Sequence, residues 1–545
     1  MNDTNLPTDG SHSLPPPDEQ HSRVGQEARR AHQGSGRDQP PRGRAAVPWR
    51  AWLGWFAAFL LIGAGWALVA PLDQVPDEAD HVYRAAAVVR GQVFPDNVTY
   101  DHGTGAIENV PVALMRPAYP GPCGKFPNAW CSFASAPPGE VTVVSGEGRM
   151  FPFYYALVGW PSLVSADRTG WYLMRLDNAF LCALMLATAA VVVMSLPRRP
   201  LVLAAAMLVG LTPDALSLTG AVNSSALETA AALCYWAVLL ALIHNNSALS
   251  RRLLVSVAVA ATVVLTLTRE YDWLWAAIAM VLVLATAGRE RWLPFLRSRV
   301  ARAMLIIIAA SAAVTEIWSL RFKAYKVFPL RPTPLSLGGA VHHSLVMAPI
   351  QLRETLGYLA WDTIPPPAVA VVCWVLAVAA VVVIGFIGSR RVGLVVAAGL
   401  VLIVAMPFAI TVAGSMHPAI GEWLGRYTLP LAVGIPLLAI ARGRPAYAER
   451  KIVIALASVI LALVICGQAA VFWHASTLFF TVPPDTPFVP LPAPTPHLDA
   501  LIGSGLLILG ALGVLGSILW AEYGRPLTQP APETSRSGTP SPARS

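Results

Sequence analysis

Charged side chains are scarce in this sequence: Asp, Glu, Lys and Arg make up 13% of the 545 residues, whereas hydrophobic residues make up 55%. The mean hydropathy is +0.55. A water-soluble chain could not bury so much apolar surface, which excludes a soluble globular protein. The net charge of +8 comes from short arginine clusters between apolar runs. These arginines do not form a basic stripe interleaved with aromatic residues, so the sequence does not indicate a nucleic-acid partner. The composition indicates an integral membrane protein in contact with the lipid bilayer.

Several motifs of soluble catalysis are also missing. There is no Walker loop, dinucleotide-binding glycine pattern, HExxH pair or nucleophile elbow. Only six cysteines are present, and no Cys/His quartet has the spacing of a zinc site. These absences argue against a soluble nucleotide-sugar donor and indicate no cofactor. A divalent ion held through waters by Asp77 and Glu78 stays an open alternative.

The two ends of the chain have a different composition from the middle. Residues 1–49 and 524–545 are rich in Pro, Ser, Gly, Arg and Gln and have few large apolar side chains. Such segments cannot offset the entropy of ordering, so both are predicted to be disordered tails. No small-residue cleavage site follows the first apolar run, so residues 52–70 are expected to remain as a signal anchor.

The apolar runs predict an all-α membrane domain over residues 50–523 with about twelve transmembrane helices, since a span needs roughly 20 apolar residues. The run 151–165 is short, aromatic and broken by Pro161, and we assign it to the membrane interface. Every short arginine-rich loop then lies on the side of the N-terminus, as the positive-inside rule requires. This predicts a multi-pass plasma-membrane protein with both termini in the cytoplasm. The expected spans are 51–70, 171–195, 200–218, 223–243, 253–268, 273–287, 302–320, 367–387, 392–413, 427–442, 452–473 and 500–520.

Four segments are expected on the outer face: a large first loop at 71–150, then loops at 321–366, 414–425 and 474–499. The first loop contains Cys123 and Cys131 in GPCGKFPNAWC. We predict a disulfide between them, because the outer compartment is oxidising and the connection can turn back. Two free thiols are the alternative. The four other cysteines fall in expected spans.

The segment VPDEADHVYR, which starts at Val75, follows the first span. A proline suited to a first helical turn, early acids and Gly91 at the far end predict a short helix on the outer surface. At helical spacing Asp77, His81 and Arg84 share one face of this helix. The simpler interpretation is that the acids only cap the helix.

Further ionisable or polar residues lie at the outer edges of the expected spans. Charges at such depth are costly and default to a functional role, although each one taken singly can be an interfacial anchor or a helix cap. Glu228 lies about a turn and a half into its helix and Arg269 ends an apolar run, so the set favours a shared polar cavity that opens outward. The set comprises Arg175, Asp177, Asp214, Asn223, Glu228, Arg269, Glu270, Asp272 and Arg426.

Four stretches carry a resemblance to a known family: PDEADHVYRAAAVVRGQ, RLDNAF, LTPDALSLTGAVNSSALE and GRYTLPL. Together they resemble the uncharacterised bacterial membrane-protein family catalogued as domain of unknown function 2142, over most of residues 51–475. That family is similar to the GT-C superfamily of membrane glycosyltransferases, which take a sugar from a polyprenyl-phosphate donor. The resemblance implies a GT-C-like fold in which Asp77 or Glu78 is the catalytic base. One departure is the pair Ser224 and Ser225, where the family often has an acid, unless Glu228 substitutes for it.

The same resemblance implies roles for the other polar residues. Six residues are expected to bind substrate, and one of the last two, Arg269 or Arg426, to stabilise the departing lipid phosphate. They are His81, Arg84, Asn223, Glu228, Arg269 and Arg426. The partners would be a polyprenyl-phosphate sugar and a glycan or lipid acceptor of the cell envelope. Two alternatives remain from the sequence, namely a transporter or flippase of a lipid-linked glycan and a non-enzymatic envelope-assembly protein.

Overall fold

The computed structural model describes residues 48–73, 75–100, 103–115, 131–132, 139–244, 247–324, 333–360, 364–417, 423–441, 451–479 and 498–523. Almost all of the two tails expected to be disordered lies outside these ranges. Cys123 also lies outside them, and only the backbone of Cys131 is described, so the disulfide stays a prediction. The other four cysteines, Cys182, Cys234, Cys373 and Cys466, are free and lie in membrane helices, as predicted.

Nine helices within the described ranges are long and apolar enough to cross a membrane, which confirms the multi-pass, helical membrane body. They form because each carries an apolar run of span length with few charges. The nine are α2 (Trp49–Val69), α7 (Arg168–Met194), α10 (Ser224–His244), α11 (Arg251–Thr268), α14 (Arg299–Phe322), α16 (Ala368–Gly388), α17 (Arg390–Met416), α21 (Lys451–Phe479) and α22 (Leu498–Tyr523).

Among the residues that the structure describes, the twelve predicted spans do not all form continuous helices of span length. The run 200–218 is bent: α8 (Pro200–Leu208) meets α9 (Pro213–Ser217) and the 3₁₀ turn η2 (Leu218–Gly220) at 86°, and this pair would be a tenth, broken span. The break falls where Pro213 has no N–H to continue the helix and Thr212 caps a new one. The run 273–287 forms α12 (Asp272–Thr286), which has only 15 residues.

The expected span 427–442 is replaced by three short pieces: η4 (Gly425–Thr428), α18 (Leu429–Ala432) and α19 (Ile435–Leu438). Pro430 and Pro436 each sit in a first turn, where the missing N–H is tolerated. Gly434 between them lies against Trp236, whose ring would come within 2.0 Å of a Cβ there. The Trp236 indole also donates to the Pro430 carbonyl at 3.0 Å. Irregular backbone is therefore held by protein rather than exposed to lipid.

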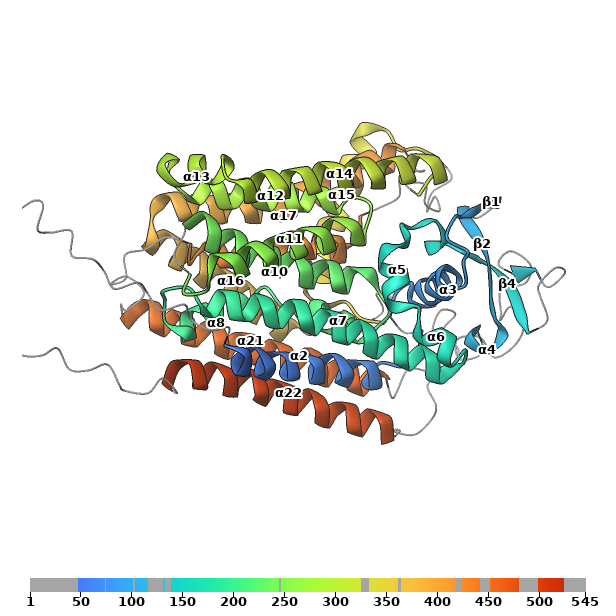
Figure 1. Ribbon diagram of the computed structural model, residues 1–545, viewed down its shortest axis with the longest axis horizontal. Helices are drawn as coiled ribbons and strands as arrows, with labels where there is room; N and C mark the ends of the chain where they lie inside the picture. The colour runs from blue at the N-terminus through green and yellow to red at the C-terminus, as the bar shows by residue number, and fades with distance from the viewer. Residues whose placement is uncertain are drawn as a thin grey trace, which may run out of the picture. The chain divides into compact units, whose positions relative to one another are not determined.

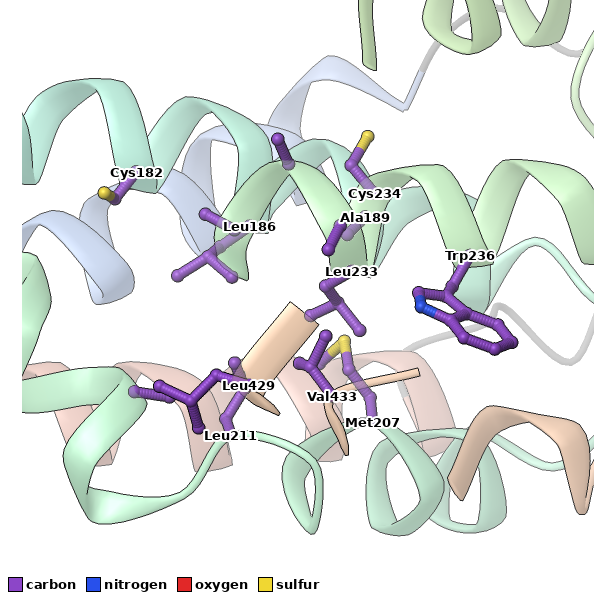
Figure 2. Close-up of a cluster of buried hydrophobic side chains, with 14 of the residues drawn as sticks. Cys182, Leu186, Ala189, Met207, Leu211, Leu233, Cys234, Trp236, Leu429 and Val433 are labelled. Carbon is purple, nitrogen blue, oxygen red and sulfur yellow. The ribbon is translucent and has the colours of Figure 1, made fainter. Parts of the chain in front are cut away.

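Helix α10 is the centre of the bundle, because every one of its residues is buried. A membrane helix that is apolar on all sides and fully enclosed has lost contact with lipid. Figure 2 shows part of the surrounding core, where side chains of α7, α8, α10 and the 429–433 segment meet. The labelled residues are Cys182, Leu186, Ala189, Met207, Leu211, Leu233, Cys234, Trp236, Leu429 and Val433.

The first and last described helices, α2 and α22, pack closely against each other, and Figure 1 shows them side by side. Glycines make this possible: a Cβ on Gly65 would lie 2.8 Å from the Gly503 carbonyl oxygen, and one on Gly510 would lie 2.8 Å from that of Ala58. Small residues allow membrane helices to approach to backbone contact.

Residues 71–150 contain the short helix that the sequence predicts and a small sheet that it does not predict. Helix α3 (Glu78–Val89) forms where a short surface helix was predicted, but ten of its twelve residues are buried because it packs against α5, β2 and η1. The sheet is antiparallel with strand order β1-β2-β4-β3, and Figure 1 shows it with α3 at one end of the helix bundle, called here the sheet end. Its strands are β1 (Asp96–Tyr100), β2 (Gly103–Pro111), β3 (Cys131–Ser132) and β4 (Glu140–Ser145). The short helix α4 (Val112–Met115) follows β2, and the 3₁₀ turn η1 (Glu147–Arg149) follows β4.

The ambiguous run 151–165 forms two short helices, α5 (Pro152–Val158) and α6 (Pro161–Val164), neither of which approaches span length. This agrees with the expectation that the run does not cross the membrane. The segment 321–366, expected as a loop, contains α15 (Leu337–Gly357), which packs against α17. The remaining described helix is α13 (Arg289–Leu296).

Candidate functional site

A buried ion pair fixes helix α3 against the bundle. Arg175 of α7 donates through Nε to Oε1 of Glu78 at 2.6 Å and through Nη2 to Oε2 at 2.5 Å, and neither side chain is exposed. The same guanidinium donates to the carbonyl oxygens of Ala67, Ala70 and Pro71 at the end of α2. A bidentate pair with satisfied remaining donors is the arrangement in which a buried charge pair holds its geometry.

The Glu78 carboxylate is fully occupied by this structure. Besides Arg175 it accepts from the backbone N–H of Val222 and of Asp73, each at 3.2 Å. A carboxylate with four donors and no exposure serves to position its neighbours. Of the two acids predicted as the base, Asp77 is therefore the one whose carboxylate is partly exposed.

Asp77 precedes α3 in a left-handed backbone conformation, with φ +62°. This conformation is uncommon outside glycine but well tolerated by Asp and Asn. Its side chain is 30% exposed and pairs with Arg426 of η4. The turn is held from the other side by Asn223, whose amide donates to the Pro76 carbonyl at 3.2 Å.

Two arginines converge on one aromatic ring beside Asp77. The guanidinium of Arg269 lies 4.4 Å from the ring centre of Tyr427, and that of Arg426 lies 5.4 Å from it. Arg269 also donates to Ser225 Oγ at 2.8 Å and lies 3.6 Å from Glu228 Oε2. The aromatic face offsets some of the repulsion between the two cations. The result is a cationic pair in which Arg269 is 20% exposed and Arg426 is nearly buried, each beside a carboxylate; two such guanidinium groups can bind an anion with several oxygens.

His81, one turn after Asp77, belongs to a buried relay. Its Nδ1 lies 2.9 Å from the Tyr155 hydroxyl, which donates to Glu147 at 3.2 Å. Burial lowers the pKa of His81 to about 3, with Asp77 opposing the shift and Arg269 and Arg426 adding to it. His81 is thus neutral at physiological pH.

Arg84 takes part in the folding of this region. It donates to the carbonyl oxygens of Gln92, Val93 and Met150 and lies 3.4 Å from Glu108 of β2. Burial raises the pKa of Glu108 to about 7, although Arg84 works in the opposite direction. These contacts tie α3 to the sheet. The described contacts of Arg84 are all with other parts of the protein, which gives this side chain a structural role. That Arg84 also contacts substrate stays a prediction.

The structure therefore brings together most of the residues predicted from the sequence. Asp77, His81, Asn223, Glu228, Arg269 and Arg426 gather at the sheet end, with Glu78 behind them. Sequence reasoning missed other members of the cluster, among them Tyr155 and Glu147. Tyr155 lies in the run 151–165, which was interpreted only by its hydrophobicity. Tyr427 could have been found from the sequence, because it directly follows the candidate residue Arg426. Within the described ranges no group of three or more His, Cys, Asp or Glu could hold a metal ion.

The fold and the site together define a multi-pass membrane protein whose polar residues converge at the sheet end. The chain belongs to the family described as predicted membrane protein (DUF2142), whose model matches residues 60–435. The match begins in α2, ends at the start of α19 and includes Asp77, Arg269 and Arg426. It confirms the resemblance seen in the four sequence stretches. No curated protein matches the sequence.

Proposed function

We propose that this protein is a GT-C-like glycosyltransferase that moves a sugar from a polyprenyl-phosphate donor to an envelope glycan or lipid. It would act at the outer face of the plasma membrane, with both termini in the cytoplasm. The observation that carries the proposal is the cluster of Asp77, Arg269 and Arg426 around Tyr427. A paired guanidinium site suits a lipid phosphate, and a partly exposed carboxylate beside it suits a proton acceptor.

In this reaction the acceptor hydroxyl oxygen attacks the anomeric carbon of the donor sugar and forms the new glycosidic bond. The bond from that carbon to the phosphate oxygen breaks, and its electron pair leaves with polyprenyl phosphate. Asp77 accepts the hydroxyl proton, while Arg269 and Arg426 hold the departing phosphate. Glu78 and Arg175 keep α3 in position, which supplies part of the rate through orientation.

The pairing of Asp77 with Arg426 supports an order of binding. In the structure Arg426 pairs with the Asp77 carboxylate. A donor phosphate competes for the same guanidinium and frees the carboxylate for the acceptor hydroxyl. The base would then become available only when a donor is present, which protects the donor from water.

The substitution Asp77→Asn tests the proposal directly. Asparagine keeps the left-handed backbone conformation but cannot accept the proton. We expect sugar transfer to fall by about a hundredfold or more, the usual contribution of general base catalysis. The measurement is transfer by the purified protein in lipid, with a panel of radiolabelled polyprenyl-phosphate sugars and envelope acceptors.

Asp73→Asn is the matched control for this experiment. Asp73 has φ +63° and a buried side chain, so the control makes the same chemical change in the same backbone conformation four residues away. Full activity of Asp77→Asn would refute the assigned base. Equal loss of activity in both variants would mean that the turn, not the carboxylate of Asp77, is what transfer requires.

Transport of a lipid-linked glycan is the second candidate, and the broken helices favour it. The 86° bend between α8 and α9 and the short helices α18 and α19 are of the kind that transporters use near their binding sites. Movement of the donor across vesicle membranes without sugar transfer would identify a flippase. An assembly scaffold would show neither activity and would tolerate Arg269→Ala.

A further inference from the structure

Two free cysteines meet where α16 packs against α21. Cys373 lies in the second turn of α16 and Cys466 near the middle of α21, and their thiols share a hydrogen bond. The next residue of α21 is in direct contact with α16, because a Cβ on Gly467 would lie 3.5 Å from the Cys373 Cβ and 2.5 Å from the Trp374 ring. The packing of the two helices therefore brings the two thiols together.

The same two helices hold the broken span formed by α8 and α9. The Trp374 indole donates to the carbonyl oxygen of Val209 at 3.0 Å, and the Gln468 amide donates to that of Leu211 at 2.9 Å. Both carbonyls lie in the break between α8 and α9, where the chain bends by 86°. A broken membrane helix persists only where its neighbours satisfy the backbone groups that the break frees. The residues that supply these two donors lie one and two positions after the cysteines.

The two thiols differ in their accessibility. Cys466 is exposed on the surface of its membrane helix, next to the exposed Ile465, whereas Cys373 is buried. An exposed side chain in the middle of a membrane helix faces lipid, so Cys466 is open to apolar reagents dissolved in the bilayer and closed to reagents in water. Two neighbouring thiols, one of them accessible, can be oxidised to a disulfide. Cys182 and Cys234 are also free, but both are fully buried.

We propose that Cys373 and Cys466 form a reversible redox site, whose disulfide fixes α16 and α21 on the break between α8 and α9. The two thiols lose two protons and two electrons and form one S–S bond, while a lipid-soluble quinone takes up both protons and both electrons and becomes a quinol. A dithiol reverses the step and itself becomes a disulfide. The inference is independent of sugar transfer, because none of the candidate site residues lies in α16 or α21.

Oxidation of the full chain in lipid nanodiscs tests the redox site. The protein is treated with a short-chain ubiquinone analogue, whose fully substituted ring cannot add to a thiol, and is then denatured, alkylated, digested and analysed by mass spectrometry. We expect a linked pair of peptides that carry positions 373 and 466 and that a dithiol separates. The linkage should be lost in Cys373→Ser and in Cys466→Ser and kept in Cys182→Ser. Cys373→Ala serves if a buried hydroxyl impairs folding.

A shift of the thiol along α21 is the matched control. Because Gly467 contacts α16, a residue two positions earlier lies about 200° away around the helix, on the opposite side. The double variant Cys466→Ser/Ile465→Cys therefore keeps an exposed thiol in lipid but should give no linkage. A linkage as strong as that of wild type would mean that the thiols meet by chance motion, and it would overturn the site. So would wild-type protein whose two thiols stay free after quinone treatment.

Hydrogen exchange tests the effect of the disulfide on the broken span. Peptides that cover residues 205–217 should exchange more slowly in the oxidised than in the reduced wild-type protein, because the helices that donate to Val209 and Leu211 can no longer separate. The two states of Cys373→Ser should exchange alike. Peptides from the contact between α2 and α22 are the internal reference and should not change. Linkage of the two cysteines without slower exchange at the break would overturn the proposed effect on α8 and α9.

Discussion

At the scale of single residues, the turn between α2 and α3 carries two acids in the same left-handed conformation but in different environments. Asp77 is partly exposed and paired with Arg426. Asp73 is buried, and burial, with Glu78 nearby, raises its pKa to about 8. At neutral pH the buried Asp73 carboxyl group therefore carries its proton. The same residue type thus serves two purposes four positions apart.

The raised pKa of Asp73 predicts a specific dependence of stability on pH. The folded protein binds this proton more tightly than the unfolded chain, whose Asp pKa is about 3.9, so stability is greatest at low pH and falls as pH rises toward about 8. Each pH unit in this window removes about 1.4 kcal/mol at most. Thermal unfolding of wild type and Asp73→Asn between pH 5 and 9 measures the effect, and the variant should show the shallower decline. Parallel curves would mean that Asp73 is ionised in the folded state.

Much of the candidate site was predictable from the cost of placing charge at a membrane edge. This cost selects Glu228, Arg269 and Arg426, while Asp77 comes from the acidic segment after the first span and from the family resemblance. These residues lie far apart in sequence and meet in the structure. Sequence alone could not divide the roles of Asp77 and Glu78, because the partner of Glu78 is 97 positions away and adjacent acids look alike in sequence. The relay of His81 was equally hidden, since Tyr155 and Glu147 lie in segments without a charge pattern.

At the scale of elements, hydropathy located the apolar runs but not their breaks. The run 427–442 has the composition of a span, yet Pro430, Gly434 and Pro436 divide it into short helices. Trp236 fills the space beside Gly434. Similarly, α15 and the sheet lie in segments too polar to be recognised as packed structure. The hydropathy of a segment indicates whether it prefers a lipid environment. The residues that pack against the segment determine whether its backbone forms one continuous helix or several short ones.

The contact between Gly434 and Trp236 predicts a large difference between two glycine substitutions. Gly434→Ala introduces a Cβ about 2.0 Å from the indole ring and should destabilise the protein by about 1–3 kcal/mol through overpacking. Gly338→Ala in the first turn of α15 meets no atom within 4 Å and should be neutral or slightly stabilising. Thermal unfolding of the two variants in the same detergent compares them. Equal stability would show that the 429–438 segment adjusts freely.

At the scale of the whole molecule, the Glu78–Arg175 pair joins the sheet-end region to the helix bundle. Removing one partner, as in Arg175→Met, leaves a buried carboxylate and should cost about 3–5 kcal/mol. The double variant Glu78→Leu/Arg175→Met should recover part of that loss, because no uncompensated charge remains. A double-mutant cycle of unfolding free energies measures the coupling. Additive effects would indicate that the two residues stabilise separate parts of the protein.

The contact between α2 and α22 has a consequence for how the protein is made. Residues 70–497 lie between the two helices, so α2 leaves the ribosome long before its glycine-lined partner is synthesised. During that interval the surface of α2 around Gly65 and Ala58 has no partner helix to contact. Arg175 can already bind the carbonyl oxygens of Ala67 and Ala70 at the C-terminal end of α2 by then, because α7 follows early. Biogenesis is therefore expected to depend on insertion factors that shield α2, and a truncation before α22 should be degraded even though every residue of the candidate site has been translated.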